Sequence, residues 1–554
     1  MKLSRFRPKI VDALKGYQIH TFIKDISSGI TVGVIALPLA IAFAIASGLN
    51  PEAGLISAVV GGFLISALGG SKVQIGGPAG AFVVIVYGIV ERYGVPNLIL
   101  STFLAGMLLF VMGLCKVGNL IRFIPVAIIT GFTSGIAVLI GFSQIRDAFG
   151  LSIDKLPGDF FSQIYEFLMM ANTANPYAML VCAGSLLLII IWPKLIALPG
   201  KKYPGLKQIP GIIVALIVAT YISKLLELPI ETIGTRFGSI PNSLPAPTVP
   251  SLDWETAKQL FAPMLTIAIL GAIESLLCAR VADNLSEDKH NPNQELMGQG
   301  IANMIVPFFG GLPVTGTIAR TATNAKAGAQ TPVSGIIHAL VVLLIMLVAA
   351  PLAIYIPMSG LAAILIYIAW NMFDAHEFKR LKQFNITYKS ILLGTFFLTV
   401  VFDLTVAVEV GLVLACVFFI YRISSLTQIE KLASPIDLND HVLSYGIYGS
   451  LFFGAIDKIE DLSLTQDSGQ QLPKVMILEM HQLINIDTSG IDSLKILAKN
   501  LKKQGTTLIV CAPNQQPKSL MERSGFIQDI GQDNCQEDLE SAYKQARRLL
   551  FPNM

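Results

Sequence analysis

The most regular feature of this sequence is a series of long apolar stretches, separated by short groups of glycine, proline, asparagine or charged residues. A helix that crosses a bilayer needs about 20 mostly apolar residues. The pattern predicts fourteen membrane segments, at 30–46, 53–68, 78–90, 97–114, 121–142, 176–194, 209–227, 259–279, 296–309, 319–328, 334–352, 358–371, 387–402 and 404–424. Because this number is even, we expect both ends of the apolar unit on one side of the membrane.

Two of these runs, 78–90 and 319–328, are too short to cross a bilayer. Backbone that is not helical at membrane depth is tolerated only inside protein or beside a watery cavity, where its polar groups find partners. Short, interrupted segments at matching places in two halves are typical of a transporter's binding site. We therefore expect two half-length helices that meet at such a site.

An internal repeat supports this expectation. Sliding the sequence along itself until Asn50-Pro51 lies on Asn291-Pro292 also places Gly69-Gly70 on Gly310-Gly311 without a gap, with six identities in 24 aligned positions. The same offset superposes the first apolar run on the eighth and places the two short runs in register, with Arg320 opposite Pro78 to Ala79, give or take three residues. Seven segments per repeat is an odd number, so the halves are expected to be inverted relative to each other.

The long apolar stretches end at Arg422, and a different pattern of short hydrophobic stretches follows. Strand-like stretches at 442–453, 474–480 and 506–511 alternate with helix-like stretches at 487–501, 519–524 and 537–550. This alternation predicts an α/β layered domain. The predicted organisation is a cytoplasmic N-terminal segment (1–25), a transmembrane transport domain (26–425), a linker (426–438) and the α/β domain (439–554).

Composition sharpens this division. The chain is 53% hydrophobic and 14% charged, whereas soluble proteins are about 25% charged. Residues 426–554 hold 28 charged residues in 129, while the much longer stretch 1–425 holds only 49. The net charge of +3 combines +7 before residue 426 with −4 after it. A nucleic-acid partner is not expected at so small a net charge.

The sequence also argues against several other kinds of chemistry. The six cysteines form no metal-type cluster, so no metal or cofactor is expected. No GxxxxGK[ST] motif is present, so ATP-driven pumping is unsupported and no enzyme activity is predicted. The basic N-terminal stretch, with no signal peptide, predicts that both termini are cytoplasmic in a bacterial inner membrane.

The approach to the first short helix suggests an anion site. Gly76-Gly77-Pro78-Ala79 follows a strand-like lead, and proline suits the first position of a helix. The free N–H groups and the dipole of a helix N-terminus favour an anion. The alternative is a packing kink in a helical bundle, where glycine is common.

The second short helix carries Arg320, an expensive residue at membrane depth unless it faces a partner or a cavity. Two helix N-termini with one arginine would make a pocket for a small anion. The alternatives are that Arg320 neutralises Glu274 or reaches towards the membrane surface. Thr321 offers a hydroxyl, although threonines inside helices commonly bond to their own backbone.

Glu274 is an isolated carboxylate within an apolar helix, and such a residue is a functional candidate by default. It is expected to carry a proton or, alternatively, to help ligate Na⁺. A structural hydrogen bond or a salt bridge to Arg320 is the competing interpretation. His338 also lies in an apolar run, where an interior histidine with satisfied hydrogen bonds is the expected role and a proton relay is the alternative.

The sequence resembles the SulP anion transporters over the whole length of the chain. The resemblance rests on DISSGITVGVIALPLAIAFAIASG (25–48), GGPAGAFVVI (76–85), IPVAIITGFTSGIAVLI (124–140), GAIESLLCA (271–279) and GLPVTGTIARTATNAKAGAQTP (311–332). The sequence is most similar to the bacterial branch that contains the aerobic C4-dicarboxylate transporter. The tail resembles a STAS domain through LINIDTSGIDSLKIL (483–497).

The resemblance implies fourteen helices in a seven-plus-seven inverted repeat, divided into core and gate domains, and a homodimer with elevator-type movement. It implies proton or sodium coupling at Glu274. The substrate-binding positions that it implies are Leu37, Leu39, Phe43, Gly77, Pro78, Ala79, Ala319, Arg320 and Thr321. Many sulfate-type members have Gln where Leu39 stands and Ser where Ala319 stands, and this less polar pocket argues against sulfate.

For the tail, the resemblance aligns Ser489 with a serine that is phosphorylated in related regulators, and acyl carrier protein is a partner by analogy. The alternative is that the DTSG segment is only a capping loop, in which Asp487 caps the following helix.

The leading functional hypothesis is a secondary anion transporter, with proton-coupled uptake of a C4-dicarboxylate or sulfate. The alternatives are a sodium-coupled bicarbonate symporter, an anion channel or exchanger, and a membrane sensor that signals through its STAS domain.

Overall fold

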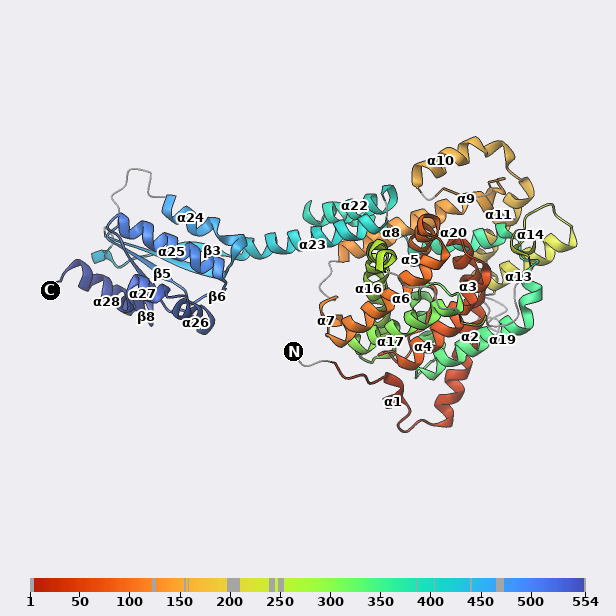
Figure 1. Ribbon diagram of the computed structural model, residues 1–554, viewed down its shortest axis with the longest axis horizontal. Coiled ribbons are helices and arrows are strands. Elements are labelled where there is room, and N and C mark those ends of the chain that lie inside the picture. Colours follow the sequence, from red (N-terminus) through yellow and green to blue (C-terminus); the bar gives the residue numbers. More distant parts are fainter. Residues whose placement is uncertain are drawn as a thin grey trace. The chain divides into compact units, whose positions relative to one another are not determined.

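The computed structural model describes residues 4–121, 126–153, 156–157, 159–196, 210–238, 245–247, 254–384, 386–402, 404–438, 441–464 and 473–552 (Figure 1). The chain forms two compact units, Met1–Leu412 and Val413–Met554, and each is considered by itself. The predicted domain boundary at 439 lies outside the described residues.

Each of the fourteen apolar runs contains a helix. The helices of the first half are α2 (Ile19–Ala46), α3 (Pro51–Ile56) continued by the π-helical turn η1 (Ser57–Gly61) and α4 (Gly62–Leu68), α5 (Gly80–Tyr93), α6 (Val95–Leu114), α8 (Val126–Ser143), α11 (Pro176–Leu195) and α13 (Gly211–Leu225). Those of the second half are α16 (Phe261–Ser286), α17 (Pro292–Ile305) with the 3-10 turn η4 (Val306–Phe309), α18 (Ile318–Lys326), α19 (Val333–Ala353), α20 (Met358–Met372), α22 (Ile386–Val401) and α23 (Leu404–Leu426). The starts of the runs at 121 and 209 include residues outside the described part.

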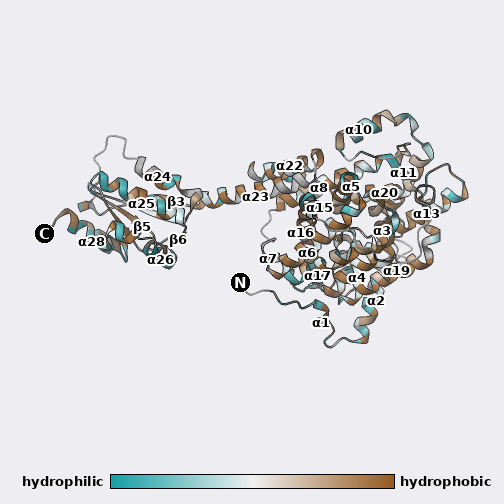
Figure 2. Ribbon diagram, in the orientation of Figure 1, coloured by the Kyte–Doolittle hydropathy of each residue, from teal (hydrophilic) through white to brown (hydrophobic). Residues whose placement is uncertain are grey.

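Within the described residues, seven helical segments are long and apolar enough to cross a membrane, and four more apolar helices are shorter. Hydrophobic residues dominate the first unit, whereas the second mixes hydrophobic and polar residues throughout (Figure 2). The first unit is therefore a helical membrane domain. Short elements connect its long helices: α1 (Lys9–Ala13), α7 (Gly118–Ile121), α9 (Ile145–Phe149), α10 (Phe160–Met169), α14 (Ile233–Phe237), α15 (Trp254–Gln259) and α21 (Ala375–Arg380).

The internal repeat is visible in the helix boundaries. At the offset that aligns Asn50 with Asn291, α16 covers nearly the same positions as α2. Asn50 and Asn291 are N-caps, each followed by proline at the first helical position. The continuous helix from Pro51 ends before Gly69, and its counterpart from Pro292 ends before Gly310. The alignment of the two halves made from the sequence is thus matched by their helix starts and stops.

The helices of the first unit pack as two groups. In the core group, α17 packs on α6 and α19 on α2, and α16 and α18 pack on each other. In the gate group, α22 and α20 pack on α8, and α11 packs on α20 and α13. The two groups meet where α2 contacts α20 and α5 contacts α8, so α2 and α5 lie at the border.

The second unit is a mixed sheet with helices on both faces. Its strands are β3 (Gln428–Leu432), β4 (Val442–Leu451), β5 (Val475–Glu479), β6 (Leu483–Ile486), β7 (Thr507–Cys511) and β8 (Cys535–Gln536), and its helices are α24 (Asp457–Leu464), α25 (Thr488–Lys503), α26 (Gln515–Arg523), α27 (Phe526–Ile530) and α28 (Leu539–Leu550). The strand order is β3-β4-β5-β7-β8, with β6 also paired to β4. Among the described strands of this sheet, only β3 runs antiparallel to its neighbour.

Two hydrophobic clusters hold these layers together. Leu494, Leu497 and Leu501 of α25 pack on one face of the sheet, as their spacing predicts. Ala542 and Ala546 of α28 pack on the other face. The predicted linker 426–438 needs correction, because it contains β3, which pairs with β4 from Gln428 to Leu432. That segment contains the edge strand of the sheet and is not simply a connection.

Candidate functional site

Two very short strands bring the two half-length helices together. Strand β1 (Gly76–Gly77) leads into α5, and strand β2 (Thr315–Gly316) leads into α18. The strands pair antiparallel, with Gly76 opposite Gly316 and Gly77 opposite Thr315. Since antiparallel strands run in opposite senses, the two helices leave this pair in opposite directions with their N-termini beside it. The expected meeting of the two half-helices is therefore present.

Neither helix N-terminus is capped by a side chain. Ala79 is the N-cap of α5 and Thr317 that of α18, and neither makes a capping side-chain hydrogen bond. The first amides of a helix have no intrahelical acceptor. The Thr317 hydroxyl instead donates to the Ile75 carbonyl at 3.1 Å. Two helix starts, each with a partial positive charge, thus face one small region.

The sequence expectation for Pro78 needs correction. Helix α5 begins at Gly80, so Pro78 precedes the N-cap and does not occupy the first helical position. It ends the extended lead, where the missing N–H of proline costs no helical hydrogen bond. The offset between the two halves also changes by three residues here. The offset of the Asn50–Asn291 pair would match the start of α5 with Thr321, but α18 begins at Ile318. Arg320 therefore corresponds to Phe82, the third residue of its own helix.

Arg320 is almost completely buried, at 2% exposure, like Phe82 in the other half. Its terminal nitrogens Nη1 and Nη2 have no hydrogen-bond partner among the described residues. A Cβ atom placed on Gly77 would lie 2.6 Å from Nη1, so the guanidinium lies directly against the backbone of β1. A buried guanidinium is expensive unless something pairs with it. Its unpaired charge beside the two helix starts favours an anion at this place.

The Thr321 hydroxyl oxygen contacts two neighbouring segments of the protein. Its oxygen accepts a hydrogen bond from the Ile75 amide at 2.9 Å and lies 3.1 Å from the Cys278 sulfur. The side chain is fully buried. The structure thus uses Thr321 to join α18 to the lead of β1 and to α16, and its expected role as an anion ligand stays a prediction. Ala319 is exposed at the start of α18, where only its backbone is polar.

Glu274 differs from the other carboxylate nearby. Its Oε2 atom is buried and has no hydrogen-bond partner among the described residues. Glu295, by contrast, accepts from the Gly70 amide at 2.8 Å and from the Ser275 hydroxyl at 3.1 Å. No ion pair joins Glu274 to Arg320 in the described part of the chain, so the salt bridge that the sequence left open is absent there. A buried carboxylate oxygen without a partner suits a proton or a cation.

The sequence expectation for His338 also needs correction. It is fully buried in α19, but neither ring nitrogen has a hydrogen-bond partner within the described residues. Its ring packs against Gly62, where a Cβ atom would lie 3.3 Å from Cε1. The expectation of an interior histidine with satisfied hydrogen bonds is therefore wrong.

The start of α5 also touches α2 and the gate group. A Cβ atom on Gly80 would lie 3.4 Å from the ring of Phe43, 3.3 Å from the Met372 sulfur and 3.6 Å from Ile140. Leu39 lies one turn from Phe43 on the same side of α2 and is also buried. Leu37 is two residues from Leu39, about 200° around the helix, so it faces a different direction.

Sequence reasoning missed Met372 and Ile140. Both lie in ordinary apolar runs, and no local pattern marks a contact between segments so far apart in the chain.

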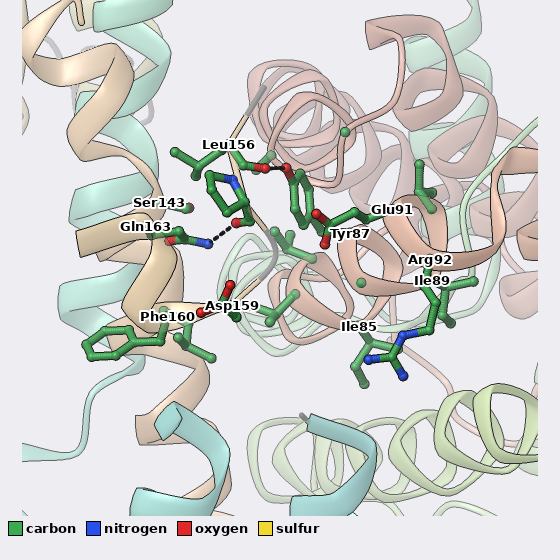
Figure 3. Close-up of a pocket in the computed structure, with 18 of the residues that line it drawn as sticks. Ile85, Tyr87, Ile89, Glu91, Arg92, Ser143, Leu156, Asp159, Phe160 and Gln163 are labelled. Atoms are coloured by element: carbon green, nitrogen blue, oxygen red, sulfur yellow. Dashed lines mark hydrogen bonds between the residues drawn. The ribbon is translucent and has the colours of Figure 1, made fainter. Parts of the chain in front are cut away.

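A cavity of ≈ 960 Å³ lies along α5 between the two groups of helices. Ile45 and Ile85 line it from α2 and α5, Ser143 lines it from α8 of the gate group, and Phe160 lines it from α10. Figure 3 shows Tyr87 bonded to the Leu156 carbonyl and Gln163 to the Pro157 carbonyl, so the 156–157 segment forms one wall. Arg92, Arg146 and Arg236 also line the cavity, and Arg236 pairs with Asp147 at 2.6 Å.

In the second unit, the DTSG segment forms the start of α25. Asp487 is the N-cap, and its carboxylate accepts from the Gly490 amide at 2.8 Å and from the Phe453 amide at 3.3 Å. Ser489 is half-buried in the first turn, and its carbonyl accepts from the Ser493 hydroxyl. The capping role expected of Asp487 is confirmed, while phosphorylation of Ser489 stays a prediction.

Replacing Asp487 by alanine is expected to loosen α25. The change removes the cap and the bond to Phe453, and the loss of an N-cap costs about 1 kcal/mol. In the full-length chain, we expect amide hydrogen exchange in residues 488–503 to accelerate about fivefold. Asp492→Ala removes an exposed carboxylate from the same helix outside the cap and serves as the control. Equal exchange in the two variants would contradict the capping role.

The sequence matches two family descriptions. "Sulfate permease family" covers residues 22–395, and "STAS domain" covers residues 434–542. The "Putative sulfate transporter YvdB" of Bacillus subtilis is 42% identical over 94% of this chain and 97% of its own length. The "Bicarbonate transporter BicA" of Picosynechococcus is 28% identical over 96% of this chain and 95% of its own length.

Solved structures show the same arrangement of helices. The transmembrane domain of a cyanobacterial bicarbonate transporter BicA superposes with a TM-score of 0.63, at 30% identity, over 72% of this chain and 98% of that chain. The murine Slc26a9 anion transporter in the inward-facing state superposes with a TM-score of 0.84, at 18% identity, over 98% of this chain and 94% of that chain. This second likeness concerns the fold alone and extends through the C-terminal unit.

Proposed function

Because the chain belongs to the sulfate permease family and is an anion transporter rather than an enzyme, we propose that it is a secondary active carrier that couples uptake of a C4-dicarboxylate to protons. The observation that carries the proposal is the meeting of two uncapped helix N-termini beside the buried, unpaired guanidinium of Arg320. One carboxylate of the substrate would accept hydrogen bonds from the free amides, and Arg320 would balance its charge.

The lining of this region supports a carboxylate with an apolar body. Leu39, Phe43 and Ala79 are buried side chains without hydrogen-bonding groups. The Thr321 hydroxyl is buried and accepts a hydrogen bond from the Ile75 amide. The donors left are backbone amides and one guanidinium, which suit a carboxylate, while the carbon chain of a dicarboxylate gains by contact with apolar walls. Sulfate, with four polar oxygens, gains little from such walls.

A sodium-coupled bicarbonate symporter is the second candidate. The likeness to the bicarbonate transporter BicA, at 30% identity in the solved transmembrane domain, favours it. Carboxylate oxygens are suitable ligands for Na⁺, so Glu274 would serve either coupling ion.

The mechanism that we propose follows from the packing. The core group carries the anion region, and the start of α5 abuts Ile140 and Met372 of the gate group. Sliding of the core group against the gate group would expose the region to one side and then to the other. The cavity beside α5 would be the route to this region from the side opposite the N-terminus, and its lining carries the carboxylates Glu91, Asp147 and Asp159 as well as three arginines.

The membrane placement and the partners belong to the same proposal. We place the protein in a bacterial inner membrane with both termini cytoplasmic, on the basic character of the N-terminal segment. A homodimer is proposed from the family resemblance, and acyl carrier protein is proposed as a ligand of the STAS domain by analogy.

Uptake by the purified full-length protein in proteoliposomes tests the function. Labelled succinate, sulfate and bicarbonate are supplied separately, each with an imposed H⁺ gradient, an imposed Na⁺ gradient or none. Succinate uptake driven by an external acid pH supports the proposal. Uptake of bicarbonate driven only by Na⁺ would transfer support to the second candidate, and gradient-independent flux of every anion would contradict coupled transport.

A further inference from the structure

A second cavity, of ≈ 780 Å³, lies at the end of the membrane unit where the N-terminal segment folds back. The segment is tied to the bundle by backbone bonds: Ser4 donates to the Leu114 carbonyl at 2.9 Å and Lys9 to the Gly69 carbonyl at 3.0 Å. The Arg7 amide donates to the Gln294 side chain at 2.7 Å. The N-terminal segment is thus held on the bundle by hydrogen bonds and forms one wall of the cavity. Helix α1 lies at the end of the unit remote from α10 (Figure 1).

Four lysines line this cavity, namely Lys9, Lys15, Lys24 and Lys72, and Asp12 is the one acidic residue among its lining residues in the described part. Lys9 lies 2.9 Å and Lys72 lies 3.5 Å from Asp288, and Lys15 lies 3.7 Å from Asp12. Lys24 pairs with no carboxylate of the described chain. With Arg7, which pairs with Asp12, and the buried Asp25 counted as well, the positive charges still outnumber the negative ones.

The remaining polar groups of the wall are occupied. Asp25 is fully buried and accepts from the Tyr17 hydroxyl at 2.9 Å, the Gln330 amide at 2.8 Å and the Thr331 hydroxyl at 2.5 Å. Burial and the neighbouring Asp25 raise the pKa of Tyr17 to about 12, so its hydroxyl stays a donor. The oxygens of Asp25 are thus already bonded to protein donors inside the wall. The open side of the cavity carries the lysine ammonium groups.

The outer side of the same elements is apolar. Six side chains of the N-terminal segment and the first turns of α2 are 38–73% exposed: Phe6, Val11, Leu14, Ile19, Phe22 and Ile23. On α2, Thr21 and Lys24 face the cavity, whereas Ile19, Phe22 and Ile23 are on the exposed surface. A basic cavity bordered by exposed apolar side chains matches a ligand with an anionic head and hydrocarbon tails.

We propose that this cavity binds the phosphate-bearing headgroup of an anionic phospholipid, whose acyl chains pass along the exposed face at the start of α2. Lys15, Lys24 and Lys72 hold the phosphate, and Lys9 stays paired with Asp288. Part of the wall is the turn 328–331 that follows α18, so the bound lipid braces the half-helix that carries Arg320.

The test is titration of the full-length protein in detergent with dioleoyl phosphatidylglycerol, with bound lipid counted by native mass spectrometry. We expect Lys15→Gln combined with Lys24→Gln to weaken binding at least fivefold, because two of the charges are lost while the Lys9–Asp288–Lys72 group is kept. Lys379→Gln combined with Lys382→Gln removes two exposed charges away from the cavity and is expected to bind as the wild type does.

Three results would overturn the proposal. Equal phosphatidylglycerol binding by the two double variants would place the lipid elsewhere. Equal binding of phosphatidylcholine and phosphatidylglycerol by the wild type would remove the requirement for anionic charge. Displacement of the lipid by an equimolar concentration of inorganic phosphate would assign the cavity to a free phosphate compound. A melting temperature for each variant within the range of the wild type establishes that all were folded.

Discussion

Replacing Arg320 by methionine is expected to lower anion uptake about 100-fold while leaving the protein at least as stable. The loss of one charged partner at a buried site costs about 3 kcal/mol of binding, which corresponds to this factor. Methionine keeps much of the volume of the side chain, so no large cavity opens. Because the guanidinium is buried without a partner, its removal also relieves a desolvation cost.

The two measurements for this variant are initial uptake in proteoliposomes and the melting temperature. Lys326→Met removes an exposed positive charge from the last turn of the same helix and is the matched control. A structural arginine would lower stability and uptake together. Uptake by the Arg320 variant equal to that of the Lys326 variant would exclude Arg320 from the anion region.

Replacing Glu274 by glutamine is expected to abolish accumulation against a gradient while sparing downhill exchange. A gradient of one pH unit supports about tenfold accumulation for each proton that moves with the substrate, when no membrane potential opposes it. Glutamine has the shape of a protonated glutamate but cannot release a proton, so the accumulation ratio should fall to about one.

The readout is the steady-state ratio of labelled succinate inside and outside proteoliposomes at several external pH values. Glu52→Gln, which neutralises a carboxylate in the first turn of α3, is the control. Retained dependence on the pH gradient in the Glu274 variant would refute its coupling role. A ratio that follows Na⁺ in the wild type and is lost in this variant would keep Glu274 as the coupling residue but replace the proton.

The architecture is largely predictable because a membrane imposes a strong pattern. All fourteen apolar runs contain helices, and the internal alignment of the sequence matches the N-caps Asn50 and Asn291. Hydrophobicity predicts that a segment is buried in lipid or protein, and cap residues predict where a helix starts. Neither reports which segments touch, so the contacts of Gly80 with Ile140 and Met372 have no local signal.

The errors at the site share a physical cause. The sequence places Pro78 at the first helical position, which Gly80 occupies, and it gives no sign that the Thr321 hydroxyl accepts a hydrogen bond from the Ile75 amide. The start of α5 and the bond between Thr321 and Ile75 both depend on where β1 pairs with β2. Each of these strands has only two residues, which is too short to show a periodic pattern in the sequence. The expectation for His338 fails for a similar reason. Whether the nitrogens of a buried ring find hydrogen-bond partners depends on neighbours from other helices.

The equivalence of Phe82 and Arg320 bears on the history of the chain. If both halves descend from one duplicated segment, the ancestral assembly had the same residue at both places. Two guanidiniums at one small site would repel each other without a doubly charged anion between them, and two phenyl rings would offer no charge at all. Divergence to one of each leaves a single positive centre in a pseudo-symmetric frame. A ligand in this frame would therefore meet a guanidinium beside one helix start and a phenyl ring beside the other, so that its two ends would lie in different surroundings.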